Sequence, residues 1–164
     1  MDRSLNKLIA ELDEAYKTFR TVVYPSPDGR KFEIILNGVK AKGILLDRAA
    51  PKTCNALWKS LPIKGYVIHA SWSGEMIRYL GAVHIPVSEY ENTMCRCVPG
   101  NITYDPKLKE LALAYGLNDF RLPQGPISLT ICGMITKNFE EFGRMCSRTK
   151  LQGVLKMEIK KARK

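Results

Sequence analysis

Four polar residues, His69, Ser71, Ser73 and Glu75, occupy alternate positions of the stretch 68–75. If this stretch is a β-strand, its side chains alternate between two faces, and all four lie on the same face. At about 3.3 Å per residue, the imidazole, both hydroxyls and the carboxylate lie within about 20 Å. Such a face can orient a polar ligand or supply an acid–base pair, so we predict His69 and Glu75 as catalytic and Ser71 and Ser73 as ligand-binding. The alternative interpretation is a strand with one solvated face.

Three further residues, Trp72, Tyr115 and Arg121, are candidate ligand contacts. Trp72 points to the other face of the predicted strand, as an anchor in the core or as a platform on which a ligand stacks. Tyr115 precedes a glycine at the end of an apparent strand, where a tyrosine serves packing as often as function. The planar fork of Arg121 can pair with a ligand carboxylate, although a lone arginine in a loop is commonly just solvated.

The formal net charge of the 164 residues is +10, which favours anionic partners. Part of this charge is a basic tail within residues 156–164. The sequence shows no zinc finger, no helix-turn-helix and no interleaving of aromatic with basic residues, so nucleic acid is an unlikely partner. We therefore predict that the partner is a small polar, anionic molecule.

The five cysteines are odd in number, which argues against a disulfide framework. Cys95 and Cys97 are two positions apart, which is closer than zinc ligands usually lie. No second pair follows them, and His69 and His84 form no ligand motif. We expect neither a metal nor a cofactor, and interpret the cysteines as small hydrophobic residues.

The elements that position these residues are predicted to be mainly strands. Runs at 32–36 and 39–46 flank Asn37-Gly38, the strongest two-residue hairpin signal. A helix begins at Pro51 and ends before Pro62. Further strands are predicted at 66–72, 76–83, 111–115, 127–135 and 153–159, and a second helix at 137–149. This pattern predicts a closed or nearly closed β-barrel capped by helices, in one domain over residues 30–160.

A further helix is predicted over residues 4–20, ahead of the barrel. Apolar residues recur along it at spacings of three and four, at Leu5, Leu8, Ile9, Leu12, Tyr16 and Phe19. The turn cluster at 25–29 separates it from the barrel, so residues 1–24 form an N-terminal appendage. We expect it to pack on the barrel or on a second subunit, and we predict a homo-oligomer, most simply a two-fold dimer.

The start of the chain, Met1-Asp2-Arg3-Ser4, leads into a charged segment rather than the apolar core of a secretion signal. No run approaches the roughly 18 apolar residues of a membrane helix. We therefore expect a cytoplasmic protein that makes no membrane contact.

Two segments resemble cyclophilins, and they occur in the same order. Residues 47–58, Asp-Arg-Ala-Ala-Pro-Lys-Thr-Cys-Asn-Ala-Leu-Trp, resemble the segment in which a strand ends and a proline opens a helix. Residues 132–142 resemble the late segment in which a glycine-containing strand leads into a short helix. The chain resembles a family of small, mostly prokaryotic, cyclophilin-like proteins of uncharacterised function more closely than it resembles the cyclophilins themselves. The pattern of that family resembles Ala50-Pro51, Leu61-Pro62, the run His69–Glu75, Pro99-Gly100, Tyr104 and Ala114-Tyr115-Gly116.

The resemblance covers roughly residues 30–160 and implies a cyclophilin-like barrel, without supplying a reaction. Cyclophilin isomerases carry Phe-His-Arg where this chain has Ile68-His69-Ala70, so Ala70 replaces the arginine that polarises the prolyl amide. We therefore expect proline isomerisation to be poor. Our leading hypothesis is a cleft beside the barrel that binds a small anionic molecule, with acid–base catalysis as an extension. The alternatives are a weak or atypical peptidyl-prolyl isomerase and a non-catalytic subunit of a metabolic complex.

Overall fold

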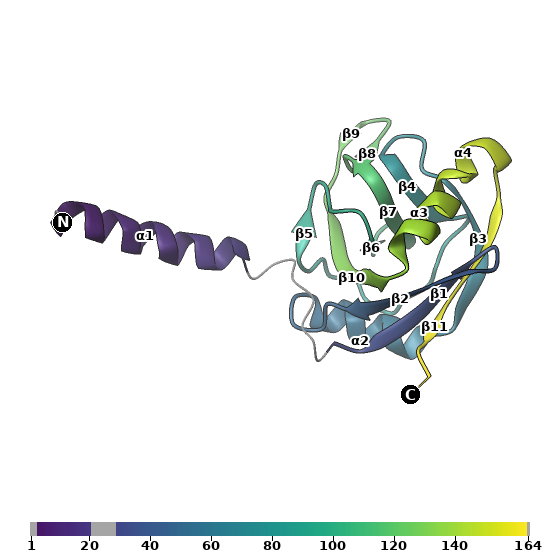
Figure 1. The fold of residues 1–164 in the computed structure, drawn as a ribbon, viewed down its shortest axis with the longest axis horizontal. Helices are drawn as coiled ribbons and strands as arrows, with labels where there is room; N and C mark the ends of the chain where they lie inside the picture. Colours follow the sequence, from purple (N-terminus) through teal and green to yellow (C-terminus); the bar gives the residue numbers. More distant parts are fainter. Residues whose placement is uncertain (1–2, 21–28, 164) are drawn as a thin grey trace.

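A computed structural model describes residues 3–20 and 29–163, and Figure 1 shows their arrangement. The predicted N-terminal helix is present as α1 (Arg3–Arg20). Residues 1–2 and 21–24 of the predicted appendage lie outside the described residues. The large apolar side chains of α1 that the structure describes, Leu5, Leu8, Ile9 and Leu12, are about half exposed, and α1 stands apart from the barrel (Figure 1).

In the described part of the chain, eight antiparallel strands close into a barrel in the order β2-β1-β11-β3-β4-β7-β6-β10, with β10 pairing back to β2. This confirms the predicted mainly-β class and the closed barrel. The strands are β1 (Lys31–Leu36), β2 (Val39–Leu45), β3 (Ile63–His69), β4 (Gly74–Tyr79), β6 (Asn101–Asp105), β7 (Glu110–Asn118), β10 (Leu129–Lys137) and β11 (Leu155–Lys161). Short strands β5 (Thr93–Met94), β8 (Arg121–Leu122) and β9 (Gly125–Pro126) lie in the connections.

The hairpin predicted at Asn37-Gly38 joins β1 and β2, and both turn residues have positive φ angles, of 46° and 91°. This is the backbone shape of the tight turn that suits twisted strands. Inside the hairpin, Gly43 lies against the ring of Phe32, where a Cβ atom would overlap the ring. The glycine therefore lets a large aromatic side chain fill the barrel at this level.

The helix predicted to begin at Pro51 is α2 (Pro51–Ser60), with proline in its first turn. Its N-cap residue is Ala50, which makes no side-chain cap. Glu91 supplies the missing acceptor from a distant loop: its carboxylate accepts the backbone N–H of Thr53 at 2.7 Å and that of Lys52 at 3.1 Å. The α2 cap is therefore a tertiary contact, unlike the usual cap within the helix's own sequence.

The helix predicted at 137–149 is divided into α3 (Phe139–Ser147) and α4 (Thr149–Gln152). Phe142 and Cys146 of α3 are buried in the main core, which fills the barrel interior. A smaller apolar cluster lies on the outer side of β4 and β7, around Met76, Ala114 and Phe120. The barrel wall near β4 therefore has packed side chains on both faces. Side chains of α3 pack against the inner face.

No helix of the described residues is both long enough and apolar enough to cross a membrane.

Candidate functional site at the β3–β4 hairpin

The predicted strand through residues 68–75 is wrong, because the chain turns in its middle. β3 ends at His69, β4 begins at Gly74, and residues 70–73 form the turn between them. Gly74 has a φ of 78°, and a Cβ atom there would lie 2.7 Å from the Leu117 carbonyl oxygen. Alternation of polar residues fits a hairpin arm as well as a continuous strand, so the pattern did not reveal the turn. The four polar residues do not share one strand face.

The hairpin nevertheless brings His69 and Glu75 together on the inner side of the barrel wall. His69 pairs with Ile77 across the two strands, and Glu75 lies two positions before Ile77, on the same face. The Tyr115 hydroxyl lies 3.2 Å from His69 Nδ1. Lys150 of α4 donates from Nζ to Glu75 Oε1 over 3.1 Å, and Nζ lies 5.6 Å from the centre of the Tyr115 ring. We call His69, Glu75, Tyr115 and Lys150 the inner cluster.

Gly116 makes the position of the Glu75 carboxylate possible. β7 is irregular opposite Glu75, and a Cβ atom on Gly116 would overlap the carboxylate. The backbone N–H of Leu117 donates to Glu75 Oε2 over 3.0 Å. Sequence analysis missed both Gly116 and Lys150 as members of this arrangement. Lys150 lies 75 residues from Glu75, and nothing in the sequence links the two.

The turn itself borders a small cleft on the outer side of the same wall. The cleft has a volume of about 190 Å³ and contains three of the predicted residues in the turn, together with Arg121 and two residues from β4 and β7. We call it the outer cleft, and its polar and aromatic lining is Ser71, Trp72, Ser73, Arg78, Glu110 and Arg121. His69 borders it too, so the inner cluster and the outer cleft meet at the end of β3.

A pair of hydrogen bonds and an ion pair connect the segments that line the outer cleft. Ser73 Oγ donates to the Arg121 carbonyl and accepts the Arg121 N–H, both over 3.2 Å. Arg78 Nη1 lies 3.5 Å from Glu110 Oε2 across the floor. Trp72 is 61% exposed, so its interpretation as a core anchor is wrong. The predicted residues therefore divide: His69, Glu75 and Tyr115 lie in the inner cluster, and Ser71, Trp72, Ser73 and Arg121 line the outer cleft.

The sequence model of one protein family matches residues 33–161, and that family is described as "Protein of unknown function (DUF3830)". The chain belongs to the DUF3830 family. The match covers the barrel from β1 to β11 and therefore both sides of the hairpin. No curated protein sequence matches this DUF3830 chain.

Two solved structures share the fold of this DUF3830 protein. The solution structure of the hypothetical protein AF2241 from Archaeoglobus fulgidus has a TM-score of 0.57 and 17% identity, covering 82% of this chain and 95% of that one. The structure of McbB in complex with tryptophan has a TM-score of 0.60 and 17% identity. It covers 81% of this chain, which spans 45% of the McbB chain. At this identity the likeness shows the fold alone.

Charge states differ between the inner cluster and the outer cleft. The hydrogen bonds from Lys150 and from the Leu117 N–H lower the pKa of Glu75, and the same contact raises the pKa of Lys150. Burial, together with Lys150, lowers the pKa of His69, so the imidazole is mainly neutral at pH 7. In the outer cleft, burial raises the pKa of Glu110, and the nearby Arg78 opposes that shift. Glu110 was not among the residues that sequence analysis selected.

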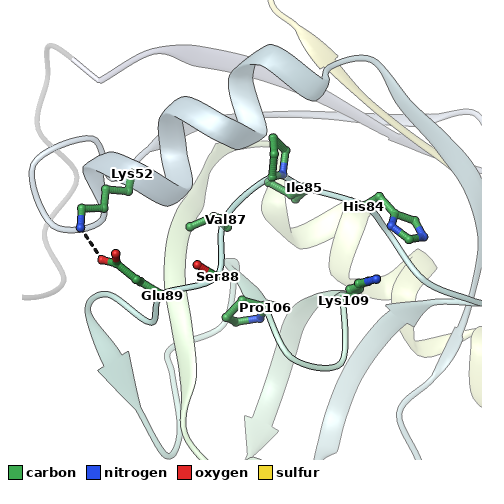
Figure 2. Close-up of a pocket in the computed structure, with 9 residues that line it drawn as sticks. Lys52, His84, Ile85, Val87, Ser88, Glu89, Pro106 and Lys109 are labelled. Carbon is green, nitrogen blue, oxygen red and sulfur yellow. Dashed lines mark hydrogen bonds and ion pairs between the residues drawn. The ribbon is translucent and has the colours of Figure 1, made fainter.

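A larger hollow, of about 660 Å³, lies between α2 and the β6–β7 turn of this DUF3830 protein. Figure 2 shows it bordered by the ion pair of Lys52 with Glu89, and by His84 and Lys109 elsewhere on its rim. It contains none of the predicted site residues. Among the residues 3–20 and 29–163, no group of three or more His, Cys, Asp or Glu side chains is arranged to hold a metal ion.

Proposed function

We propose that this DUF3830 protein binds a small carboxylate-bearing molecule in the outer cleft. The observation that supports this most is the presence of two arginines, Arg78 and Arg121, in a cleft of about 190 Å³. An arginine presents its N–H groups in a planar fork that matches a carboxylate. The net charge of +10 adds a general attraction for anions.

The volume limits the ligand, or the part of it that enters the cleft, to a few heavy atoms. A water molecule takes up about 30 Å³, so the outer cleft has room for about six waters. Typical pockets for drug-sized ligands are larger, about 300–1,000 Å³. A bulky ligand would therefore place its carboxylate in the cleft and extend its remaining atoms along the exposed ring of Trp72.

Both arginines have a carboxylate nearby but keep N–H groups for a ligand. Arg78 meets Glu110 through Nη1 at 3.5 Å, and Arg121 meets Asp119 through Nη2 at 3.3 Å. A guanidinium has five N–H donors, so each ion pair leaves donors available. Burial raises the pKa of Glu110, and Arg78 opposes that shift because it favours the charged carboxylate.

In this proposal His69 and Glu75 act as positioning residues at the two ends of the turn. Their hydrogen bonds, to Tyr115 and Lys150, fix β3 and β4 where the turn begins and ends. Acid–base catalysis by His69 and Glu75 stays a prediction. His69 is the better placed of the two for it, since it also borders the outer cleft.

The fold relatives suggest which ligands to try first. The McbB structure is a complex with tryptophan, an amino acid that carries a carboxylate. The resemblance to cyclophilins likewise favours a cleft beside the barrel. Amino acids and small mono- and dicarboxylates are therefore the first class to test.

A thermal-shift screen against carboxylates, amides and amines tests the proposal. A carboxylate at 100 times its dissociation constant adds about 2.7 kcal/mol, which raises the melting temperature of a domain this size by about 5–10 °C. Arg78→Gln and Arg121→Gln should each remove about half of that shift or more, because a tenfold loss of affinity lowers the stabilisation to about 1.4 kcal/mol. Arg144→Gln, an exposed arginine paired with Glu140 on α3, is the control and should keep it. A preference for amines, or a full shift in both cleft variants, would overturn the proposal.

A weak peptidyl-prolyl isomerase is the second candidate, and Arg78 is the observation that favours it. Arg78 pairs with Ile68 across β3 and β4, two positions from Ala70, and enters the outer cleft. Arg78 could therefore supply a positive charge near Ala70, the position at which cyclophilin isomerases carry their arginine. A proline tetrapeptide assay decides between the two functions: a rate that depends on Arg78 supports the isomerase.

We also propose that α1 pairs with α1 of a second copy to form a two-fold dimer. Its four described large apolar side chains, Leu5, Leu8, Ile9 and Leu12, are 48–57% exposed and form one stripe. Pairing two such stripes removes apolar surface from water on both copies. Light scattering should give twice the chain mass for the full chain and a single mass for a chain that begins at Thr21. A monomer in both cases would exclude this dimer, and association of the shortened chain would place the interface on the barrel.

A further inference from the structure

Lysines gather on the outer side of the barrel, away from the hairpin site. The outward positions of four adjacent strands carry six of them: Lys31 on β1, Lys40 and Lys42 on β2, Lys156 and Lys160 on β11, and Lys64 on β3. The side chains between them, such as Phe32 and Ile34, are buried in the barrel. We call these six lysines and the residues among them the lysine face. Two carboxylates, Glu33 and Glu158, share it.

The two glutamates neutralise only part of this charge. Lys160 Nζ lies 2.9 Å from Glu33 Oε1, and Lys64 Nζ lies 3.6 Å from Glu158 Oε1. Lys31, Lys40, Lys42 and Lys156 form no ion pair with any carboxylate in the described ranges. The hydrogen bond from Lys160 lowers the pKa of Glu33, and Lys40 and Lys42 add to that effect. The lysine face therefore keeps an excess of positive charge.

An exposed aromatic ring lies among these lysines. Tyr66 on β3 is 50% exposed and pairs with Lys156 across β11. It borders a hollow of about 490 Å³ whose lining includes Ile35, Gly38 and Gly65. Lys64, Lys156 and Glu158 line the same hollow, so a flat ring can lie against Tyr66 while charged groups reach Lys64 and Lys156.

We propose that the lysine face binds single-stranded nucleic acid, with phosphates on the unpaired lysines and one base stacked on Tyr66. Proteins that bind single strands combine a basic surface along the backbone with aromatic rings on which bases stack. The four strands span about 15 Å, and successive outward residues along each strand lie about 6.7 Å apart. This area holds a few nucleotides, at the lower end of the roughly 4–16 bound per small barrel domain.

Other polyanions fit this surface less well. A membrane surface would need well-exposed apolar side chains to insert, whereas the apolar residues among these lysines include Tyr66, which is half exposed, and Ile35 and Ile44, which are half-buried. Reading a duplex needs a helix or ribbon that enters the major groove, whereas this face is the wall of a closed barrel. An exposed aromatic ring beside unpaired lysines on a sheet surface fits splayed single-stranded bases.

The sequence argues against nucleic acid because aromatic and basic residues do not alternate along it. The structure supplies the missing pattern through register: Lys156 of β11 and Tyr66 of β3 are 90 positions apart in the chain and adjacent in the sheet. The sheet also places Lys40 of β2 and Glu158 of β11 on either side of Ile35 of β1. The signal depends on strand order, and a linear pattern search therefore does not find it.

Fluorescence anisotropy of the full chain with a labelled oligothymidylate of about 12 nucleotides tests this proposal. Four unpaired lysines predict a slope of log affinity against log salt near −3, or about a 50-fold loss from 50 to 200 mM salt. Replacing two of them, Lys40→Glu with Lys156→Glu, should weaken binding at least tenfold and bring the slope to about −1.5.

A matched control separates this face from net charge alone. Lys59→Glu with Lys107→Glu changes the charge by the same amount at two exposed lysines elsewhere, and should change affinity by less than twofold. Tyr66→Leu should weaken binding about tenfold, while Tyr66→Phe keeps the ring and should keep the affinity. Melting temperatures confirm that each variant folds.

Several outcomes would overturn the proposal. Equal losses in the two lysine double variants would show that net charge alone attracts the oligonucleotide. Binding of a 12-base-pair duplex at least as tightly as the single strand would assign the face to duplexes. Tighter binding to phosphatidylserine vesicles than to the oligonucleotide would assign it to membranes. No anisotropy change at 50 mM salt would remove the site altogether.

Discussion

The two sides of the β3–β4 hairpin use polar residues in opposite ways. On the inner side, Glu75 is held by Lys150 and by a backbone N–H, and the His69 ring meets the Tyr115 hydroxyl. On the outer side, Arg78 and Arg121 face a cleft with donors left over from their ion pairs. Satisfied groups fix geometry, whereas groups with spare donors can exchange partners. The inner cluster therefore suits a positioning role, and the outer cleft suits binding.

The largest effect is expected from Gly116→Ala, which places a Cβ atom where the Glu75 carboxylate lies. Overpacking of this kind costs about 1–3 kcal/mol, so the free energy of unfolding measured by urea denaturation should fall by about 2 kcal/mol. The ligand shift at the outer cleft should fall too, because the turn moves with Glu75.

A second glycine provides the control for Gly116→Ala. Gly143 lies in α3, and a Cβ atom there would meet Phe139 at an ordinary 3.6 Å. Gly143→Ala should raise the free energy of unfolding by up to about 1 kcal/mol, as alanine favours helix. Equal stability of the Gly116→Ala variant and the native chain would show that the inner cluster does not fix the hairpin.

Arg121→Gln should have the next largest effect, on affinity rather than stability. A hydrogen bond to a charged group contributes about 1.5–3 kcal/mol, so the affinity for a stabilising carboxylate should fall at least tenfold. Arg121 is half exposed and, among the described residues, its guanidinium pairs with Asp119, so stability should change by less than about 0.5 kcal/mol. Isothermal titration and urea denaturation measure the two quantities. A large loss of stability with unchanged affinity would reverse the roles we assign to the two sides.

Glu75→Gln should have a smaller and pH-dependent effect. Glu75 and Lys150 are each about 40% exposed, so their pairing contributes less than about 1 kcal/mol. The pKa of Glu75 is lowered from 4.5 in the folded state, so this stabilisation is present above pH 4.5 and is lost as the pH falls through the lower folded pKa. The difference in unfolding free energy between wild type and variant should therefore shrink in acid. A difference that grows in acid would contradict the inner pairing.

The smallest expected effect is on proline isomerisation, which should stay at the uncatalysed rate in the tetrapeptide assay. Ala70 is 8% exposed and packs in the cluster with Met76 and Phe120, so no charged group occupies its position. Arg78→Gln should leave the rate unchanged. A rate well above background that falls in this variant would make the outer cleft an isomerase site.

Local sequence signals predicted much of the barrel. The Asn37-Gly38 hairpin and the helix from Pro51 depend on short-range geometry, and both are confirmed. The strand Asn101–Asp105 was missed although polar and apolar residues alternate along it, because it is only five residues long and prolines at 99 and 106 flank it closely. The predicted strand at 76–83 extends past the end of β4 at Tyr79, because apolar residues continue into the loop.

The site was less predictable because its members meet through tertiary contacts. His69 and Glu75 were expected to share one face of a single strand, and they lie on the two arms of a hairpin instead. Arg78 and Glu110 pair through the β4–β7 register, which a single sequence does not show. The alternating pattern in the sequence therefore identified the polar residues near the turn, whereas their interaction partners became known only from the structure.

The α2 cap has a consequence for the order in which the chain acquires structure during synthesis. The backbone N–H of Thr53 donates to the carboxylate of Glu91, which is synthesised 38 residues later. At about 5–20 residues per second, a ribosome needs about 2–8 s to add that length. The first turn of α2 therefore leaves the ribosome with its amide groups bonded only to water. It gains its permanent acceptor after the β3–β4 hairpin has been synthesised.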